Sequence, residues 1–300
     1  MSLIALGTIA LDNVKTPSGY KKEMLGGSVA HFAMSARLFT KVHLAAVVGH
    51  DFPKKYIRLL ESKGVDITSV ITGKEKTFRW HGEYKKEDLN TAITLETILG
   101  VLMSYEPRIA DHQRHLPNIF LANIDPDIQM KVLDLMHDPR LIGLDSMNLW
   151  INHKFKSLMK LIRRVDLFVA NDAEARAISG EQNLIKAAKC LHRLGPRFIV
   201  VKKGEHGVLF YADDCKFSFP AYPVEQVVDP TGAGDTFAGG LMGYLSKARK
   251  INRKVLKQAV LHATALASFN VEGFGMEKTA RLTLPIVRKR IHELVEFMSL

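Results

Sequence analysis

The sequence is poor in cysteine and has no long apolar run. Its two cysteines, Cys190 and Cys215, show neither CxxC spacing nor a neighbouring histidine cluster. This scarcity argues against a disulfide or zinc framework and favours a reducing cytoplasm. The apolar N-terminal stretch reaches Asp12 without a basic leading region and is too short to cross a bilayer. We therefore expect a soluble, cytoplasmic protein with no membrane partner.

Acidic residues are also in deficit. Asp and Glu total 31 against 42 Lys and Arg, which gives a formal charge of +11 and a pI near 9.5. Only residues 247–254 and 288–290 are densely basic, and neither segment carries the interleaved aromatics of a base-stacking platform. The scattered charge favours a solvated basic surface over a nucleic-acid partner.

Short β-branched or apolar runs alternate with segments of helical spacing. Leu184, Ala187, Ala188, Leu191 and Leu194 fall on one helical face, which predicts a helix over 182–194 that ends at Gly195-Pro196. This alternation is typical of a doubly wound α/β domain, and the absence of a linker predicts a single domain over 1–300. The predicted buried parallel strands are 3–10, 42–48, 118–123, 141–145, 166–171 and 197–203.

Two polar, turn-rich stretches, 13–25 and 70–93, interrupt this rhythm. The alternation over 77–80 suits a small sheet with one exposed face. We interpret segments near 13–25 and 70–100 as a flap, or lid, over the carboxyl ends of the main strands. The alternative is a pair of surface hairpins with Phe78 and Trp80 packed inward.

The stretch DPTGAGDTFAGG, residues 229–240, places glycines directly before an apolar helical run. We interpret it as a strand-to-helix turn in which Gly232 and Gly234 let backbone N–H groups converge on an anion, aided by the helix dipole. Asp235 would repel that anion unless it serves the other reactant, for example by accepting a hydroxyl proton. The alternative is an ordinary acidic residue in a first helical turn.

The full stretch resembles the signature of the ribokinase-like carbohydrate kinases, the PfkB family. Further segments resemble that family in the expected order along nearly the whole chain: Asp12, 26–39, 47–52, 171–175, 200–209 and 262–275. The resemblance implies a three-layer α/β/α fold with a mostly parallel central sheet and a small β-sheet lid. It also implies a kinase that uses ATP and Mg²⁺ to phosphorylate a hydroxymethyl group of a sugar, sugar acid or nucleoside.

On the acceptor side, the resemblance makes Asp235 the catalytic base. It implies that Asp12, at the end of the first strand, accepts hydrogen bonds from substrate hydroxyls; the alternative is a turn-forming Asp. The other implied residues are Gly232, Ala233 and Gly234, whose amides form the anion hole, and Gly26, Gly27 and Ser28, where the backbone approaches the sugar. The alternative for this glycine-serine segment is a plain helix entry with Ser28 as N-cap, and both roles can hold at once.

On the nucleotide side, Asn171 and Glu174 match the family's Asn-x-x-Glu, which arranges water and Mg²⁺ near the phosphates, although the pair could simply cap a helix. Lys202 and Lys203 depart from the uncharged residues usual there, and either could meet a phosphate or be solvated at a strand end. The remaining implied residues are Gly204 and Gly207 in a nucleotide-side turn, and His262 and Gly273 near the adenine, with a structural role as the alternative for His262.

His31 is a departure, since the family usually carries Asn at this position. A histidine changes size and hydrogen bonding, so plain ribose or fructose specificity is in doubt. Residues 78–80 could stack on a planar substrate or pack on the main domain. Whether K⁺ binds near Asp229 and Thr231 stays open, and a homodimer through the lid is an expectation. The alternative function is a catalytically weak sensor of nucleotide or sugar with the same fold.

Overall fold

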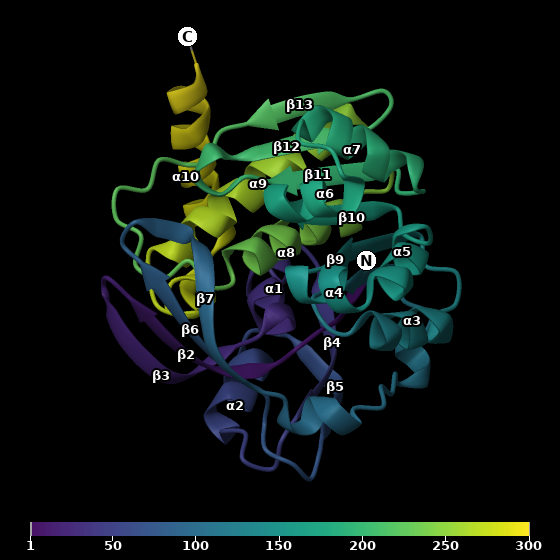
Figure 1. Ribbon diagram of the computed structural model, residues 1–300, viewed down its shortest axis with the longest axis vertical. Coiled ribbons are helices and arrows are strands. Elements are labelled where there is room, and N and C mark those ends of the chain that lie inside the picture. The colour runs from purple at the N-terminus through teal and green to yellow at the C-terminus, as the bar shows by residue number, and fades with distance from the viewer. Residues whose placement is uncertain (1, 300) are drawn as a thin grey trace.

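The predicted strands assemble into one large sheet in a computed structural model that describes residues 2–299 (Figure 1). Its nine strands lie in the order β13-β12-β11-β10-β9-β8-β1-β4-β5, and all pair in parallel except the antiparallel edge formed by β12 and β13. The strands are β1 (Ser2–Leu6), β4 (Lys41–Val48), β5 (Asp66–Thr72), β8 (Asn118–Leu121), β9 (Leu141–Asp145), β10 (Leu167–Asn171), β11 (Phe198–Lys202), β12 (Val208–Tyr211) and β13 (Lys216–Phe219).

Helices cover both faces of this sheet, which confirms the three-layer α/β/α architecture. One apolar core lies under α1 (Ser28–Ala36), α2 (Lys54–Ser62), α8 (Ala233–Ser246) and α9 (Arg253–Val271). The other lies under α3 (Pro126–Leu135), α4 (Asn148–His153), α5 (Phe155–Ile162), α6 (Asp172–Ser179) and α7 (Leu184–Arg193). Helix α10 (Leu284–Met298) packs on α9. Short 3₁₀ turns are η1 (Gly100–Ser104), η2 (Asp111–Gln113), η3 (Gly204–His206) and η4 (Thr279–Arg281).

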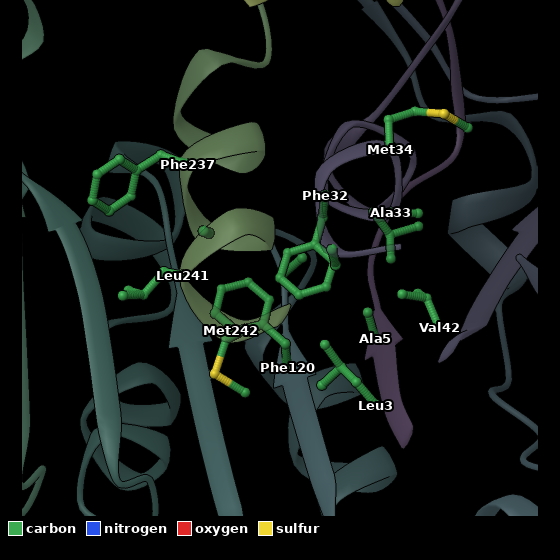
Figure 2. Close-up of a cluster of buried hydrophobic side chains, with 14 of the residues drawn as sticks. Leu3, Ala5, Phe32, Ala33, Met34, Val42, Phe120, Phe237, Leu241 and Met242 are labelled. Atoms are coloured by element: carbon green, nitrogen blue, oxygen red, sulfur yellow. The ribbon is translucent and has the colours of Figure 1, made fainter. Parts of the chain in front are cut away.

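The contact between α1 and α8 fixes the position of the glycine-rich segment. Figure 2 shows Met242 of α8 beside Phe120 of β8 and Phe32 of α1, whereas Phe237 and Leu241 of α8 point away from these two rings. The Phe32 and Phe120 rings stack with centroids 4.6 Å apart. A Cβ on Gly239 would lie 2.1 Å from the Phe32 carbonyl oxygen, so only glycine permits this approach of the two helices. The close approach at Gly239 therefore fixes the position of α8 against α1.

A second, smaller sheet forms beside the main one (Figure 1). Its order is β3-β2-β6-β7, with β2 (Ala10–Thr16), β3 (Gly19–Gly26), β6 (Arg79–Lys85) and β7 (Asp88–Ile98). The predicted small sheet is thus confirmed, with three corrections. The first strand ends at Leu6, so Asp12 lies in β2 of the small sheet. Residues 70–72 belong to β5, because they pair with β4. Strand β6 begins only at Arg79, because buried Thr77 instead hydrogen-bonds Asp51.

The predicted helix over 182–194 is confirmed as α7, with Ala187, Ala188 and Leu191 buried. Cys190 and Cys215 are both free thiols. Among residues 2–299, no helix has both the length and the apolar character that a bilayer crossing requires.

Candidate active site

The glycine-rich segment forms the turn that starts α8, but no strand precedes it. Strand β13 ends at Phe219, and the residues that lead from it to the turn form a loop. The reason is that this loop pairs with no strand: the amides of Val228 and Asp229 donate to the carbonyl of Val271, at the end of α9. The expectation of a strand-to-helix turn was therefore wrong in its first half. The helix start itself is as predicted.

The amides of this turn are only partly used within the protein. Ala233 N–H donates to the carbonyl of Pro230 at 3.1 Å, and Thr236 N–H donates to that of Gly232 at 2.8 Å. The N–H groups of Gly232, Gly234 and Asp235 have no acceptor among the described residues. Unpaired amides at a helix start carry partial positive charge and attract anions. The turn therefore offers an anion site, with the Ala233 amide committed to the turn itself.

The imidazole of His31 packs against this turn at Gly232. Gly232 has a φ of +73°, and a Cβ there would lie 2.3 Å from Cγ of His31. His31 is buried and lies 3.2 Å from Oδ1 of Asn270 through its Nδ1. Asn270 also accepts from the hydroxyl of Thr236 and donates to the carbonyl of Thr231. Burial lowers the pKa of His31, so a neutral ring helps to hold the turn.

Asp229 anchors the other end of the turn. Its buried carboxylate accepts the N–H groups of Thr231 at 2.9 Å and of Gly275 at 3.0 Å. The turn is thus joined to the loop that follows α9. The conformation of the anion site depends on two segments 46 residues apart in the sequence.

Asp235 lies in the first turn of α8, partly buried and surrounded by charge. Burial and the neighbouring Asp145 raise the pKa of Asp235 to about 8, against the opposing charge of Lys202. The charges of Asp12 and Glu174 raise this pKa further. A carboxylate with a raised pKa is a stronger proton acceptor once it is ionised, as a general base requires.

Three consecutive strands bring side chains to one edge of the sheet. Asp145 ends β9, Asn171 ends β10 and Lys202 ends β11. Lys202 Nζ donates to Oδ2 of Asp145 at 2.9 Å across the end of β10. A Cβ on Gly234 would lie 3.1 Å from that same Nζ. The carboxyl ends of parallel strands are where ligands of open α/β sheets bind, and here they face the start of α8.

Asn171 and Glu174 form a capping box at the start of α6. Glu174 N–H donates to Oδ1 of Asn171 at 2.8 Å, and Asn171 N–H donates to Oε2 of Glu174 at 2.7 Å. The capping alternative is therefore confirmed. Burial raises the pKa of Glu174 to about 7, against the charge of Lys202. In this capping position, Glu174 is close enough to Lys202 and Asp145 for its charge to interact with theirs.

Asp12 faces the glycine pair that precedes α1. A Cβ on Gly26 would overlap its carboxylate, and Gly27 has a φ of +89°. Burial raises the pKa of Asp12 to about 7, against a hydrogen bond from the Gly27 backbone. Oδ1 of Asp12 is buried without a hydrogen-bond partner among residues 2–299. A buried unpaired oxygen is costly unless a ligand satisfies it, so Asp12 is available to a hydroxyl donor.

Ser28 has a different place from the one expected. Gly27 is the N-cap of α1, and Ser28 is the first helical residue. Its hydroxyl donates to the carbonyl of Asn123 at 2.9 Å and accepts the Thr8 N–H at 3.1 Å. These bonds join the segment that follows β1 to the segment that follows β8. The N-cap alternative for Ser28 was wrong, because a side chain inside the first turn is held by these neighbouring loops.

The small sheet reaches across the edge of this site. Thr16 donates to the carbonyl of Val228 at 2.7 Å, and the hydroxyls of Thr231 and buried Tyr84 lie 3.4 Å apart. Burial raises the pKa of Tyr84, and the charges of Asp229, Asp12 and Asp235 add to the rise. The β6–β7 hairpin therefore lies above the glycine-rich turn.

The same hairpin touches the turn between β11 and β12. A Cβ on Gly204 would lie 2.3 Å from Oδ1 of Asn90, whose amide also donates to Glu205. Gly204 and Gly207 both have positive φ, and Lys203 N–H donates to the Gly207 carbonyl at 2.8 Å. The β6–β7 hairpin and this turn are thus in contact with each other at the border of the site.

His262 does not lie at this site. Its ring packs on Phe39 and Tyr244, with centroids 5.5 and 4.6 Å away. The ring is buried, and its Nδ1 lies 2.7 Å from the carbonyl oxygen of Gln258 within α9. The structural alternative for His262 is therefore favoured over an adenine contact. Gly273 lies in the loop after α9, where a Cβ would lie 2.8 Å from the Lys278 side chain.

Sequence reasoning missed two residues of the site. Asp145 ends a predicted strand, so its position at a carboxyl end was a usable signal. Tyr84 continues the alternation of Trp80 and Gly82, which puts its side chain on the inner face of β6. No group of three or more His, Cys, Asp or Glu side chains within residues 2–299 is arranged to hold a metal ion.

Comparisons with known proteins agree with this geometry. Residues 140–281 match the family described as pfkB family carbohydrate kinase. The chain is 32% identical over 261 residues to a cytidine kinase of Thermococcus kodakarensis, covering 85% of this chain and 92% of that protein. It is 27% identical over 290 residues to a nucleoside kinase of Methanothermobacter thermautotrophicus, covering 92% and 91%.

The fold agrees as well. A structure of a putative Ribokinase II from E. coli, in complex with ATP and Mg²⁺, superposes with a TM-score of 0.80 over 97% of this chain and 99% of that one, at 20% identity. The identity to the Thermococcus kinase exceeds 30% over nine-tenths of that protein. The chain therefore belongs to the pfkB family of carbohydrate kinases.

Proposed function

We propose that this PfkB-family kinase transfers the γ-phosphoryl group of ATP to the hydroxymethyl group of a nucleoside. The observation that carries the proposal is the setting of Asp235. Its carboxylate lies beside two unpaired backbone amides, that of Gly234 and that of Asp235 itself. The carboxylate is also close enough to Asp12 for the two charges to interact. One site thus pairs a proton acceptor with an anion site, which is the pair of functions that phosphoryl transfer to an alcohol needs.

In the proposed step, the acceptor hydroxyl loses its proton to Asp235 while its oxygen bonds to the γ-phosphorus. The bond between that phosphorus and the β–γ bridging oxygen breaks, and ADP leaves. Asp12 holds a neighbouring hydroxyl of the acceptor through its unpaired oxygen. The amides of Gly232, Gly234 and Asp235 stabilise the charge on the group in transfer.

A nucleoside is favoured over a bare sugar by two observations. Two relatives that are matched over most of their length, at 32% and 27% identity, are named as a cytidine kinase and a nucleoside kinase. In addition, Trp80 pairs in register with Asp12, so the two side chains share one face of the small sheet. The indole lies over Gly82, where a Cβ would be 2.0 Å from the ring, and it is only partly buried. This aromatic face beside Asp12 is suited to stacking on a planar base.

The residues present fit ATP and Mg²⁺. Bound with ATP, Mg²⁺ would neutralise charge on the β- and γ-phosphates. We place it near Glu174, through water, because Glu174 commits one oxygen to the Asn171 cap. Support for K⁺ is weaker, since both oxygens of Asp229 accept backbone N–H groups and the Thr231 carbonyl accepts from Asn270. Turnover measured in the chloride salts of K⁺, Na⁺ and tetramethylammonium tests whether K⁺ assists the reaction.

A homodimer through the small sheet is also proposed. Strand β7 is an edge strand of that sheet, and Leu95, Ile93 and Ile98 on it are exposed. An unpaired edge with exposed apolar side chains is suited to a second copy of the chain. Light scattering should give a dimer mass that Leu95→Lys reduces to that of the monomer. A wild-type monomer at working concentration would reject this proposal.

The direct test is ADP release from Mg-ATP with a panel of nucleosides, pentoses, hexoses and sugar acids. Turnover should be confined to nucleosides. Asp235→Asn keeps the shape but removes the base, and should lower kcat about 100- to 10,000-fold. The matched control is Asp111→Asn, whose carboxylate is exposed in η2. A fall of less than tenfold for Asp235→Asn would remove the base role from this residue.

A further inference from the structure

Lys202 is an unusual residue for its position. It ends a buried strand, and only 18% of its side chain is exposed. A lysine in such a place is costly unless its ammonium is paired. Its hydrogen-bond partner is Asp145, whose side chain is 4% exposed. The adjacent Lys203 makes no side-chain hydrogen bond or ion pair within the part of the chain that the structure describes.

The surroundings of Lys202 hold more negative charge than one ion pair requires. The charges of Asp145, Glu174 and Asp235 all act on its ammonium. A purely structural pair would need only Asp145. An ATP molecule adds still more negative charge to this edge of the sheet. The buried ammonium offsets part of the repulsion between these carboxylates and a phosphate, which a pair that served the fold alone would not need to do.

The direction of the side chain decides where that phosphate would lie. Nζ lies 3.1 Å from where a Cβ on Gly234 would be, so the ammonium is against the turn itself. Beside it are the unpaired amides of Gly234 and Asp235 at the start of α8. The ammonium thus lies at the start of α8, near two unpaired amides and within the range of the Asp235 charge. In the proposed transfer, the acceptor oxygen meets the γ-phosphorus beside that carboxylate.

We propose that Lys202 is a further catalytic residue, whose ammonium contacts a non-bridging oxygen of the phosphoryl group during its transfer. The inference rests on the proposed kinase function and deepens it. The bonds made and broken stay those of the transfer from ATP to the acceptor oxygen, with the proton passing to Asp235. Lys202 keeps its own protons and stabilises the charge that the transition state places on the group. Asp145 holds the ammonium in that position.

The test compares three variants in the full-length enzyme. Lys202→Met keeps the length of the side chain but removes the charge, and should lower kcat about 100-fold, while the KM for Mg-ATP changes less than threefold. Lys202→Arg should recover at least a tenth of wild-type kcat, because it restores a cation. The matched control is Lys203→Met, which should stay within threefold of wild type.

A fourth variant separates this role from a structural one. Lys202→Met leaves Asp145 buried without its partner, so the double variant with Asp145→Asn removes both charges. If Lys202 only neutralises Asp145, the double variant should recover both kcat and the melting temperature. That result would overturn the proposal. If Lys202 contacts the phosphoryl group, kcat stays low even when melting recovers. Wild-type enzyme without ADP release on any acceptor would instead reject the kinase function itself.

Discussion

Gly232→Ala tests the reasoning about the turn most directly. At a φ of +73°, any residue with a Cβ costs about 1–2 kcal/mol. The new Cβ would also lie 2.3 Å from Cγ of His31, and overpacking of this kind costs about 1–3 kcal/mol. The buried ring cannot swing away, because its Nδ1 is held by Asn270. We therefore expect a total loss of about 2–5 kcal/mol in the free energy of unfolding.

The matched control is Gly180→Ala. Gly180 has the same φ of +73°, but a Cβ there meets nothing within 4 Å. This variant isolates the backbone cost. An unfolding entropy of about 0.6 kcal/mol/K for 300 residues converts the costs to a fall in Tm of about 2–3 °C for Gly180→Ala and about 3–8 °C for Gly232→Ala.

Two measurements check this expectation. Thermal unfolding should show Gly232→Ala melting below Gly180→Ala, and the double variant with His31→Ala should recover the steric part of the loss. ADP release should also fall about 100-fold in Gly232→Ala, because the anion site is displaced, but not in Gly180→Ala. Equal melting temperatures for the two glycine variants would refute the packing of His31 against the turn.

Three further outcomes follow from the site. Because burial raises the pKa of Asp235 to about 8 from 3.8, ionising it costs stability as pH rises from about 4 to 8, so the Tm of Asp235→Asn minus that of wild type should grow between pH 5 and pH 9. A constant difference would contradict the raised pKa. Ser28→Ala should cost about 1–3 kcal/mol in urea unfolding, by leaving the Thr8 N–H unpaired, while kcat stays within threefold. His262→Phe keeps an aromatic ring against Tyr244, so the KM for ATP should change less than twofold. A tenfold rise in this KM would instead support a contact between His262 and the adenine.

The elements themselves could be predicted from the sequence because their signals are local. Buried β-branched runs gave the parallel strands, and apolar spacing gave α7 between Leu184 and Arg193. The glycine-rich turn, its helix and the unusual carboxylate of Asp235 were visible for the same reason. The first strand was predicted too long because apolar character continues past Leu6, whereas the chain leaves one sheet for another at that point.

What only the tertiary structure decided is which distant side chains share the site. The sequence placed Asp145 in a strand but could not show that Lys202 reaches it across β10. It placed His31 after the glycine pair but could not show the ring beneath Gly232, nor His262 at the far end of α8. Local pattern fixes the elements because it depends on neighbouring residues, whereas contacts between segments far apart in the sequence depend on how the layers pack.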